Sequence, residues 1–222
     1  MGLDRAGKAI ILVLFLFILP IFLTVLFMPK FILVIGITME LILIILLKKK
    51  TLDYSLGEVG LSSDIDFKKH ILIPLVFSVG IYILVLASAG FKIKITYNPT
   101  EYLILMIYYT LYVGVFEELL FRGLFFSALE EKYGAWAIVI SALVFASIHI
   151  DNIVFPLIWG LIAGAYRYKY KNITGLILAH GLIDFLGQTI DSTNINVTFY
   201  LLSLSILTAL LMYCFLRTRE EN

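Results

Sequence analysis

Two adjacent glutamates and an arginine stand inside a run of apolar residues, in the sequence FEELLFRG at positions 116–123. Glu118 and Arg122 are four residues apart, so in a helix they lie on one face and can form an ion pair. Glu117 is rotated by about 100° from that face, and it has no cation at helical spacing. A carboxylate without a cationic partner is available as a general base. The motif therefore divides into a structural pair, Glu118 with Arg122, and a candidate catalytic group, Glu117.

Two of the three histidines lie in later apolar runs. His149 ends the sequence FASIH, four residues after Phe145, and His180 begins HGLID, four residues before Asp184. In a helix the carboxylate of Asp184 can reach the imidazole of His180 and fix its tautomer. A base, a second group that orients water and an oriented histidine donor are what hydrolysis of an acyl bond needs. Each residue alone is better explained by a hydrogen bond between helices, but the presence of Glu117, His149, His180 and Asp184 on three runs indicates a shared polar cavity.

The composition indicates that lipid is the solvent. Hydrophobic residues make up 61% of the 222 positions and charged residues 15%, whereas soluble domains have roughly 45–50% and about 25%. The basic residues lie at the ends of apolar runs rather than in a patch, so no nucleic-acid partner is expected. The composition therefore predicts a membrane protein.

Membrane-spanning segments must be helices here, since lipid offers no hydrogen-bond partner to the backbone, and each needs about 20 mostly apolar residues. We therefore predict an all-α polytopic fold, one transmembrane domain over residues 1–222, with the catalytic helices at 101–190 around a polar cavity. The fifth and sixth spans are short, and we expect a tight hairpin that does not fully cross the bilayer. The first run is expected to be a retained span rather than a signal peptide. The eight predicted spans are Ala9–Met28, Phe31–Leu47, Ile71–Gly90, Glu101–Leu129, Ala135–Ile150, Ile153–Tyr166, Ile173–Ile190 and Val197–Leu216.

The distribution of basic residues predicts the orientation of these spans. With a cytoplasmic N-terminus, thirteen of the 17 Lys and Arg residues fall in cytoplasmic segments, and only Lys30, Lys92 and Lys94 fall outside. Arg122 is the one that remains within a span. The positive-inside rule therefore favours eight spans in the cell membrane, with both termini in the cytoplasm.

Other features have ordinary structural explanations. Glu40 has no motif around it, and we expect it to be structural or to line the cavity. Gly160 and Gly164 form the small-xxx-small pair that is typical of closely packed membrane helices. Cys214 is the single cysteine, so it forms no internal disulfide, and we expect a buried, inert thiol.

Three motifs in order resemble those of a known family. EELLFR, FASIH and HGLID match E-E-x-x-x-R, F-x-x-x-H and H-x-x-x-N/D of the CPBP family, the CAAX prenyl endopeptidase and bacteriocin-processing membrane proteins, also called the abortive-infection family. The resemblance covers roughly the second half of the chain. It implies an intramembrane glutamate protease without a metal or other cofactor, acting on a membrane-associated peptide or protein such as a lipidated protein or a leader peptide.

The resemblance also implies a role for each residue. Glu117 and His149 would activate a water, His180 with Asp184 would stabilise the oxyanion, and Glu118 with Arg122 would brace the site. The prenyl-endopeptidase branch has Asn at the position of Asp184, and an ionised Asp cannot donate to an oxyanion. CAAX substrates in particular are therefore not implied.

Other functions remain open from the residues alone. His149, His180 and a carboxylate could bind zinc, although no H-E-x-x-H sequence is present. A catalytically silent immunity factor or scaffold could bind a peptide in the same cavity. Carboxylates and histidines within spans also mark proton paths in transporters.

Overall fold

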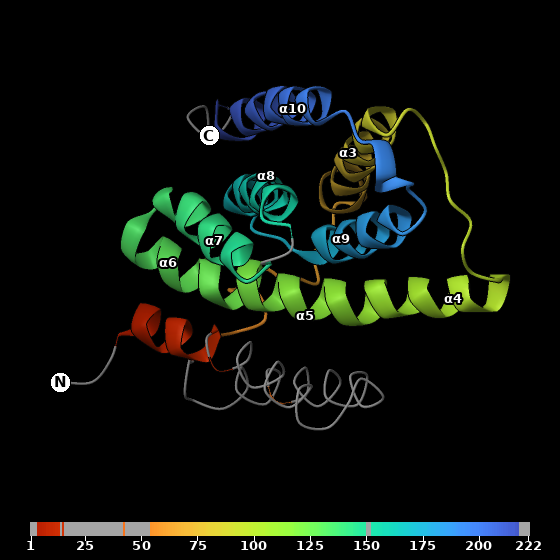
Figure 1. The fold of residues 1–222 in the computed structure, drawn as a ribbon. Coiled ribbons are helices and arrows are strands. Elements are labelled where there is room, and N and C mark those ends of the chain that lie inside the picture. The colour runs from red at the N-terminus through yellow and green to blue at the C-terminus, as the bar shows by residue number, and fades with distance from the viewer. Residues whose placement is uncertain (1–3, 14, 16–41, 43–53, 150–151, 218–222) are drawn as a thin grey trace.

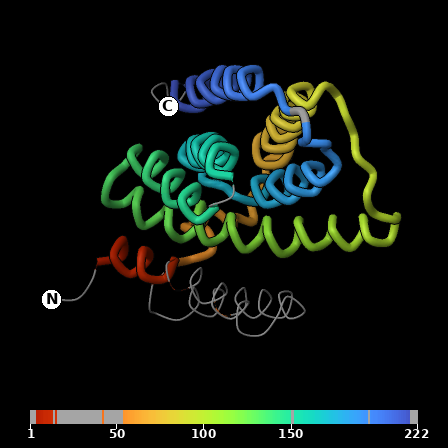
Figure 2. Tube along the Cα trace, in the orientation of Figure 1, coloured from red at the N-terminus to blue at the C-terminus, as the bar shows by residue number. Residues whose placement is uncertain are grey.

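The computed structural model describes residues 4–13, 15, 42, 54–149 and 152–217 (Figures 1 and 2). These residues form helices and connecting segments, and the one extended pairing among them is an isolated antiparallel bridge between Ile93 and Ile190. The predicted all-α class is therefore confirmed.

Residues 5–13 are helical. The later elements are η2 (Phe67–Leu72), α3 (Ile73–Ser88), α4 (Pro99–Ile107), η3 (Tyr108–Gly114), α5 (Val115–Glu118), η4 (Leu119–Phe125), α6 (Phe126–Tyr133), α7 (Trp136–Ser147), α8 (Val154–Tyr170), α9 (Thr174–Gly187), η5 (Ser192–Asn194) and α10 (Val197–Arg217). Figure 1 shows α8 between α10 and the long helix that runs from α4 to α6.

Three of these helices are long and apolar enough to cross a membrane, judged by length and composition: Phe67–Ser88, Pro99–Tyr133 and Val197–Arg217. α7 and α9 are shorter apolar helices. The 12 residues of α7 rise only about 18 Å at roughly 1.5 Å per residue, less than the roughly 30 Å of the hydrocarbon core. The first two predicted spans and Glu40 lie mostly or wholly outside the described residues, so the count of eight stays a prediction.

The helix Pro99–Tyr133 carries both glutamates and changes its winding around them. It begins with a capping box between Asn98 and Glu101 and ends before Gly134, which has a positive φ of 57°. The single α-helical turn of α5 lies between two π-helical segments, η3 and η4. π-helical turns are uncommon and often occur at functional sites.

Glycines let this helix and its neighbours approach closely. A Cβ built on Gly114 would lie 2.4 Å from the carbonyl oxygen of Ile177, and one on Gly181 would lie 2.4 Å from Cα of Thr110. This contact packs η3 against α9 and so places α5, which follows η3, near α9. A Cβ on Gly160 would lie 2.8 Å from Cα of Ala142, so α8 packs directly on α7. The close packing expected at Gly160 is confirmed.

The segment before η2 also packs against the long helix. Val59 is fully buried, and the carbonyl of Glu58 accepts hydrogen bonds from Ser127 Oγ at 2.8 Å and from Arg167 Nη2 at 2.7 Å. Arg167 Nε also donates to the carbonyl of Arg122 at 3.1 Å. This network ties the segment before η2 and the helix α8 to the long helix.

The expected burial of Cys214 is wrong, because the thiol is exposed on α10. The face of α10 that packs against the bundle carries Leu204, Thr208 and Phe215, which are its buried residues. Cys214 lies next to Phe215 in sequence and therefore on another face of the helix. An apolar run predicts a span but not which of its faces contacts protein.

Candidate active site

Glu118 is the centre of the buried polar cluster. Its Oε1 lies 3.1 Å from Nη1 of Arg122 and accepts a hydrogen bond of 2.9 Å from the indole N–H of Trp159. The same oxygen is 2.7 Å from Nδ1 of His180. The side chains of Glu118 and Arg122 are 0% and 1% exposed. Four helical segments, α5, η4, α8 and α9, are therefore tied together at one carboxylate.

The ring of Phe145, on α7, packs against Arg122 and both histidines. The guanidinium carbon of Arg122 lies 4.1 Å from the centre of the Phe145 ring, a cation–π geometry that favours a buried guanidinium. The same ring is 4.6 Å from the ring of His149 and 5.9 Å from the ring of His180. The phenylalanine of the FASIH sequence thus contacts residues of all three motifs.

Glu117 faces two histidines that come from different helical regions. Its Oε2 is 3.8 Å from Nε2 of His180 on α9 and 3.9 Å from Nε2 of His149, which follows α7. Both distances exceed a direct hydrogen bond and suit a bridge through one water. The side chain of Glu117 is 16% exposed and that of His149 is 31% exposed. The side chain of Glu117 is therefore less enclosed than that of Glu118, although the Oε2 atom that faces both histidines is itself buried.

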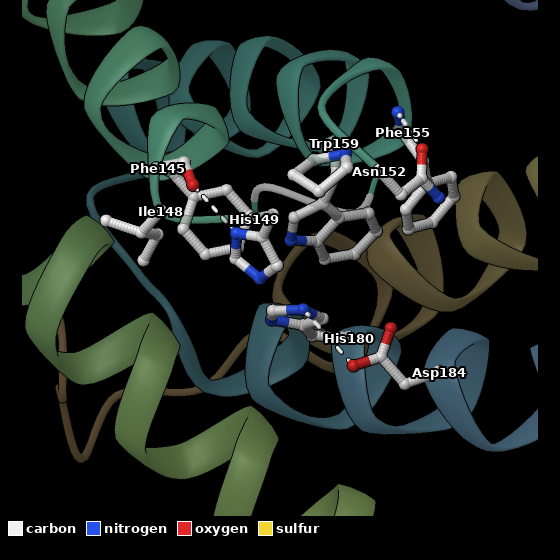
Figure 3. Close-up of a pocket in the computed structure, with 9 residues that line it drawn as sticks. Phe145, Ile148, His149, Asn152, Phe155, Trp159, His180 and Asp184 are labelled. Atoms are coloured by element: carbon white, nitrogen blue, oxygen red, sulfur yellow. Dashed lines mark hydrogen bonds and ion pairs between the residues drawn. The ribbon is translucent and has the colours of Figure 1, made fainter. Parts of the chain in front are cut away.

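A pocket of about 540 Å³ adjoins this cluster. Figure 3 shows His149, Trp159 and His180 around it, with Asp184 beside His180. Asn152 and Phe155 also line it, whereas Glu117 is not among its lining residues and lies 3.8 and 3.9 Å from the two histidines that are. The volume is within the range of about 300–1,000 Å³ that ligand pockets have.

All six residues singled out in the sequence lie close together. The contacts that join them are the Glu118–Arg122 pair, the contacts of Glu117 with both histidines, and a distance of 3.6 Å from Asp184 Oδ2 to Nε2 of His180. From the sequence, Asp184 is expected to orient His180. The shorter contact to that ring is made by Glu118, at 2.7 Å instead of 3.6 Å. Glu118 is thus the partner of the imidazole as well as of Arg122.

Trp159 is a residue of the site that the sequence analysis missed. It is fully buried, donates to Glu118, and its ring lies 5.0 Å from the ring of His180. The only sign of its role in the sequence is its position next to Gly160, the residue at which α8 packs on α7. Apolar runs commonly contain Trp, so the pattern alone does not separate it from a packing residue.

In the described part of the chain, no group of three His, Cys, Asp or Glu side chains is arranged to hold a metal ion.

Comparisons with known proteins agree with the motif resemblance. Residues 99–186 match the family described as Type II CAAX prenyl endopeptidase Rce1-like. The match begins at the first residue of α4 and ends one residue before the end of α9, so it contains all six motif residues. No curated protein and no solved structure matches the chain.

Proposed function

We propose that this protein, whose residues 99–186 carry the Rce1-like match, is an intramembrane endopeptidase that uses Glu117 to activate water. The observation that supports this proposal is the closeness of Glu117 Oε2 to the Nε2 atoms of both His149 and His180, at 3.9 and 3.8 Å. A water that bridges a carboxylate and an imidazole next to a pocket is placed for attack on a bound peptide carbonyl.

In the proposed reaction Glu117 takes a proton from the water, while the oxygen of the water bonds to the scissile carbonyl carbon. His149 orients this water, and its ring is fixed because Nδ1 lies 2.8 Å from the carbonyl of Phe145. The tetrahedral intermediate then loses its C–N bond, and Glu117 returns the proton to the departing amine. The products are a new carboxyl terminus and a new amino terminus.

His180 is the proposed donor to the oxyanion. Glu118 lies at its Nδ1 and Asp184 lies on the side of Nε2, so each ring nitrogen faces a carboxylate. In the proposed imidazolium form both ring nitrogens are donors, and Nε2–H donates to the developing oxyanion. Removal of one such donor costs about 10²–10³ in rate in other hydrolases.

The proposal is tested in membranes of cells that express the wild type or Glu117→Gln at equal levels. Peptides released from the membranes are identified by mass spectrometry. Glu131→Gln is the matched control, because Glu131 lies on the same long helix and its side chain is 47% exposed in a pair with Arg5. We expect products from the wild type and the control and none from Glu117→Gln. Equal products from all three would refute the assignment of the base.

A further inference from the structure

A second pocket of about 760 Å³ lies next to the first. The two share Asn152, Phe155 and Asp184 among their lining residues, so they meet at these side chains. The second pocket extends from there between α3, α9 and the beginning of α10. A molecule bound at the histidines can therefore continue into it past Asp184.

We propose that the second pocket binds an apolar stretch of the substrate's own peptide chain, next to the scissile bond. This inference rests on the proposed endopeptidase function and adds the class of substrate: a peptide with bulky aliphatic or aromatic residues at a defined distance from the cut.

The lining of the pocket fits a peptide better than a bare hydrocarbon. Val85, Ile183 and Ile195 supply aliphatic surface, while Gln188 and Ser192 supply polar groups. A peptide can place apolar side chains against the aliphatic surface and hydrogen-bond the polar groups with its backbone N–H and C=O groups. A hydrocarbon chain would cover the polar groups without bonding them, which is unfavourable.

Helix α9 gives the distance between the two pockets. His180 lines the first pocket, Asp184 lines both and Gly187 lines the second. The seven residues from His180 to Gly187 rise about 10 Å at roughly 1.5 Å per residue. An extended peptide advances about 3.3 Å per residue, so it covers this length in about three residues. The second pocket should therefore select the residue about three positions from the cut.

Gly187 allows the pocket to be filled without disturbing the fold. A Cβ built there meets no atom within 4 Å, so Gly187→Leu places its side chain in open space. Gly80 has the same open surroundings on α3 and lines neither pocket, which makes Gly80→Leu the matched control. Ile195→Ala is the opposite change, because it enlarges the second pocket.

The experiment uses the full chain in vesicles of phosphatidylcholine and phosphatidylglycerol. The probes are synthetic peptides with an aliphatic core in which one position at a time is Ala, Leu, Phe or Trp, each made with and without an alkyl chain. Products are quantified by mass spectrometry. Gly187→Leu should reduce cleavage of peptides with Leu, Phe or Trp about three positions from the cut by roughly 10-fold or more relative to Ala peptides. Ile195→Ala should favour Trp, and Gly80→Leu should match the wild type.

Each other outcome overturns a definite part of this account. If the wild type cleaves but Gly187→Leu keeps the same preferences, or if Gly80→Leu changes them equally, the second pocket is not the subsite. If Gly187→Leu selects by the length of the alkyl chain and not by residue size, the occupant is a lipid chain. If the wild type cleaves no peptide of either kind, the proposed function fails together with the subsite.

Discussion

The replacement Glu118→Ala removes the one carboxylate that contacts Arg122, His180 and Trp159 at once. It leaves the guanidinium of Arg122, which is 1% exposed, without its counter-charge. Breaking one partner of a buried ion pair costs about 3–5 kcal/mol. The indole N–H of Trp159 also loses its acceptor, which alone costs about 1–3 kcal/mol. Because both contacts use the same oxygen the two costs are not additive, and we expect a destabilisation of about 3–5 kcal/mol.

Thermal unfolding of purified protein in one detergent measures this loss. For a chain of this length 1 kcal/mol corresponds to roughly 2–4 °C, so the midpoint of Glu118→Ala should fall by roughly 6–20 °C. Glu117→Gln is the control, since Glu117 is not part of the pair with Arg122 and the replacement keeps the size of the side chain. Its midpoint should stay close to that of the wild type.

A double replacement tests the physical reason for the loss. If the cost comes from an unbalanced buried charge, removing both charges with Glu118→Leu and Arg122→Met should restore most of the stability. A Glu118→Ala protein that unfolds at the wild-type temperature would refute the account of the cluster. A double variant that is no more stable than Glu118→Ala would show that the hydrogen bonds, and not the charge balance, carry the energy.

Three other predictions address the chemistry and the topology. A strong chelator that reaches the pocket should leave activity unchanged, whereas loss of activity that is restored by added Zn²⁺ would favour a metalloprotease. Asp184→Asn should keep measurable activity because Glu118 holds the imidazole of His180, and Asp184→Ala should be slower. If Asp184→Asn is as inactive as Glu117→Gln, the carboxylate of Asp184 is itself essential. Cysteines introduced at Lys49 and Lys171 should be labelled from the cytoplasm and one at Asn194 from outside; labelling of Lys49 and Asn194 from the same side would overturn the eight-span topology.

The local parts of this structure could be predicted from the sequence. The helix predicted at Glu101–Leu129 lies within Pro99–Tyr133, and the span predicted at Val197–Leu216 lies within α10. The pair of Glu118 and Arg122 could be predicted too, because a spacing of four residues places them on one helical face. These features depend on neighbours along the chain, and hydropathy and spacing describe such neighbours directly.

The contacts between helices could not be predicted in the same way. Glu118 rather than Asp184 makes the close contact to His180, because the crossing of η3 and α9 at Gly114 and Gly181 brings the adjoining α5 near α9. The role of Trp159 likewise depends on the approach of α8 to the bundle. A pattern of apolar residues does not specify where two helices cross, and the π-helical turns on both sides of α5 have no recognisable signal in it.

The most direct test of the central claim is peptide hydrolysis by purified protein in lipid vesicles. The wild type is compared with Glu117→Gln, after the unfolding midpoints of both proteins have shown that they are folded. The substrate is a membrane peptide that wild-type membranes process, and the new termini are identified by mass spectrometry. The account predicts one new carboxyl terminus and one new amino terminus with the wild type, and no cleavage above background with Glu117→Gln. Cleavage at the same bond and a comparable rate by folded Glu117→Gln would contradict it.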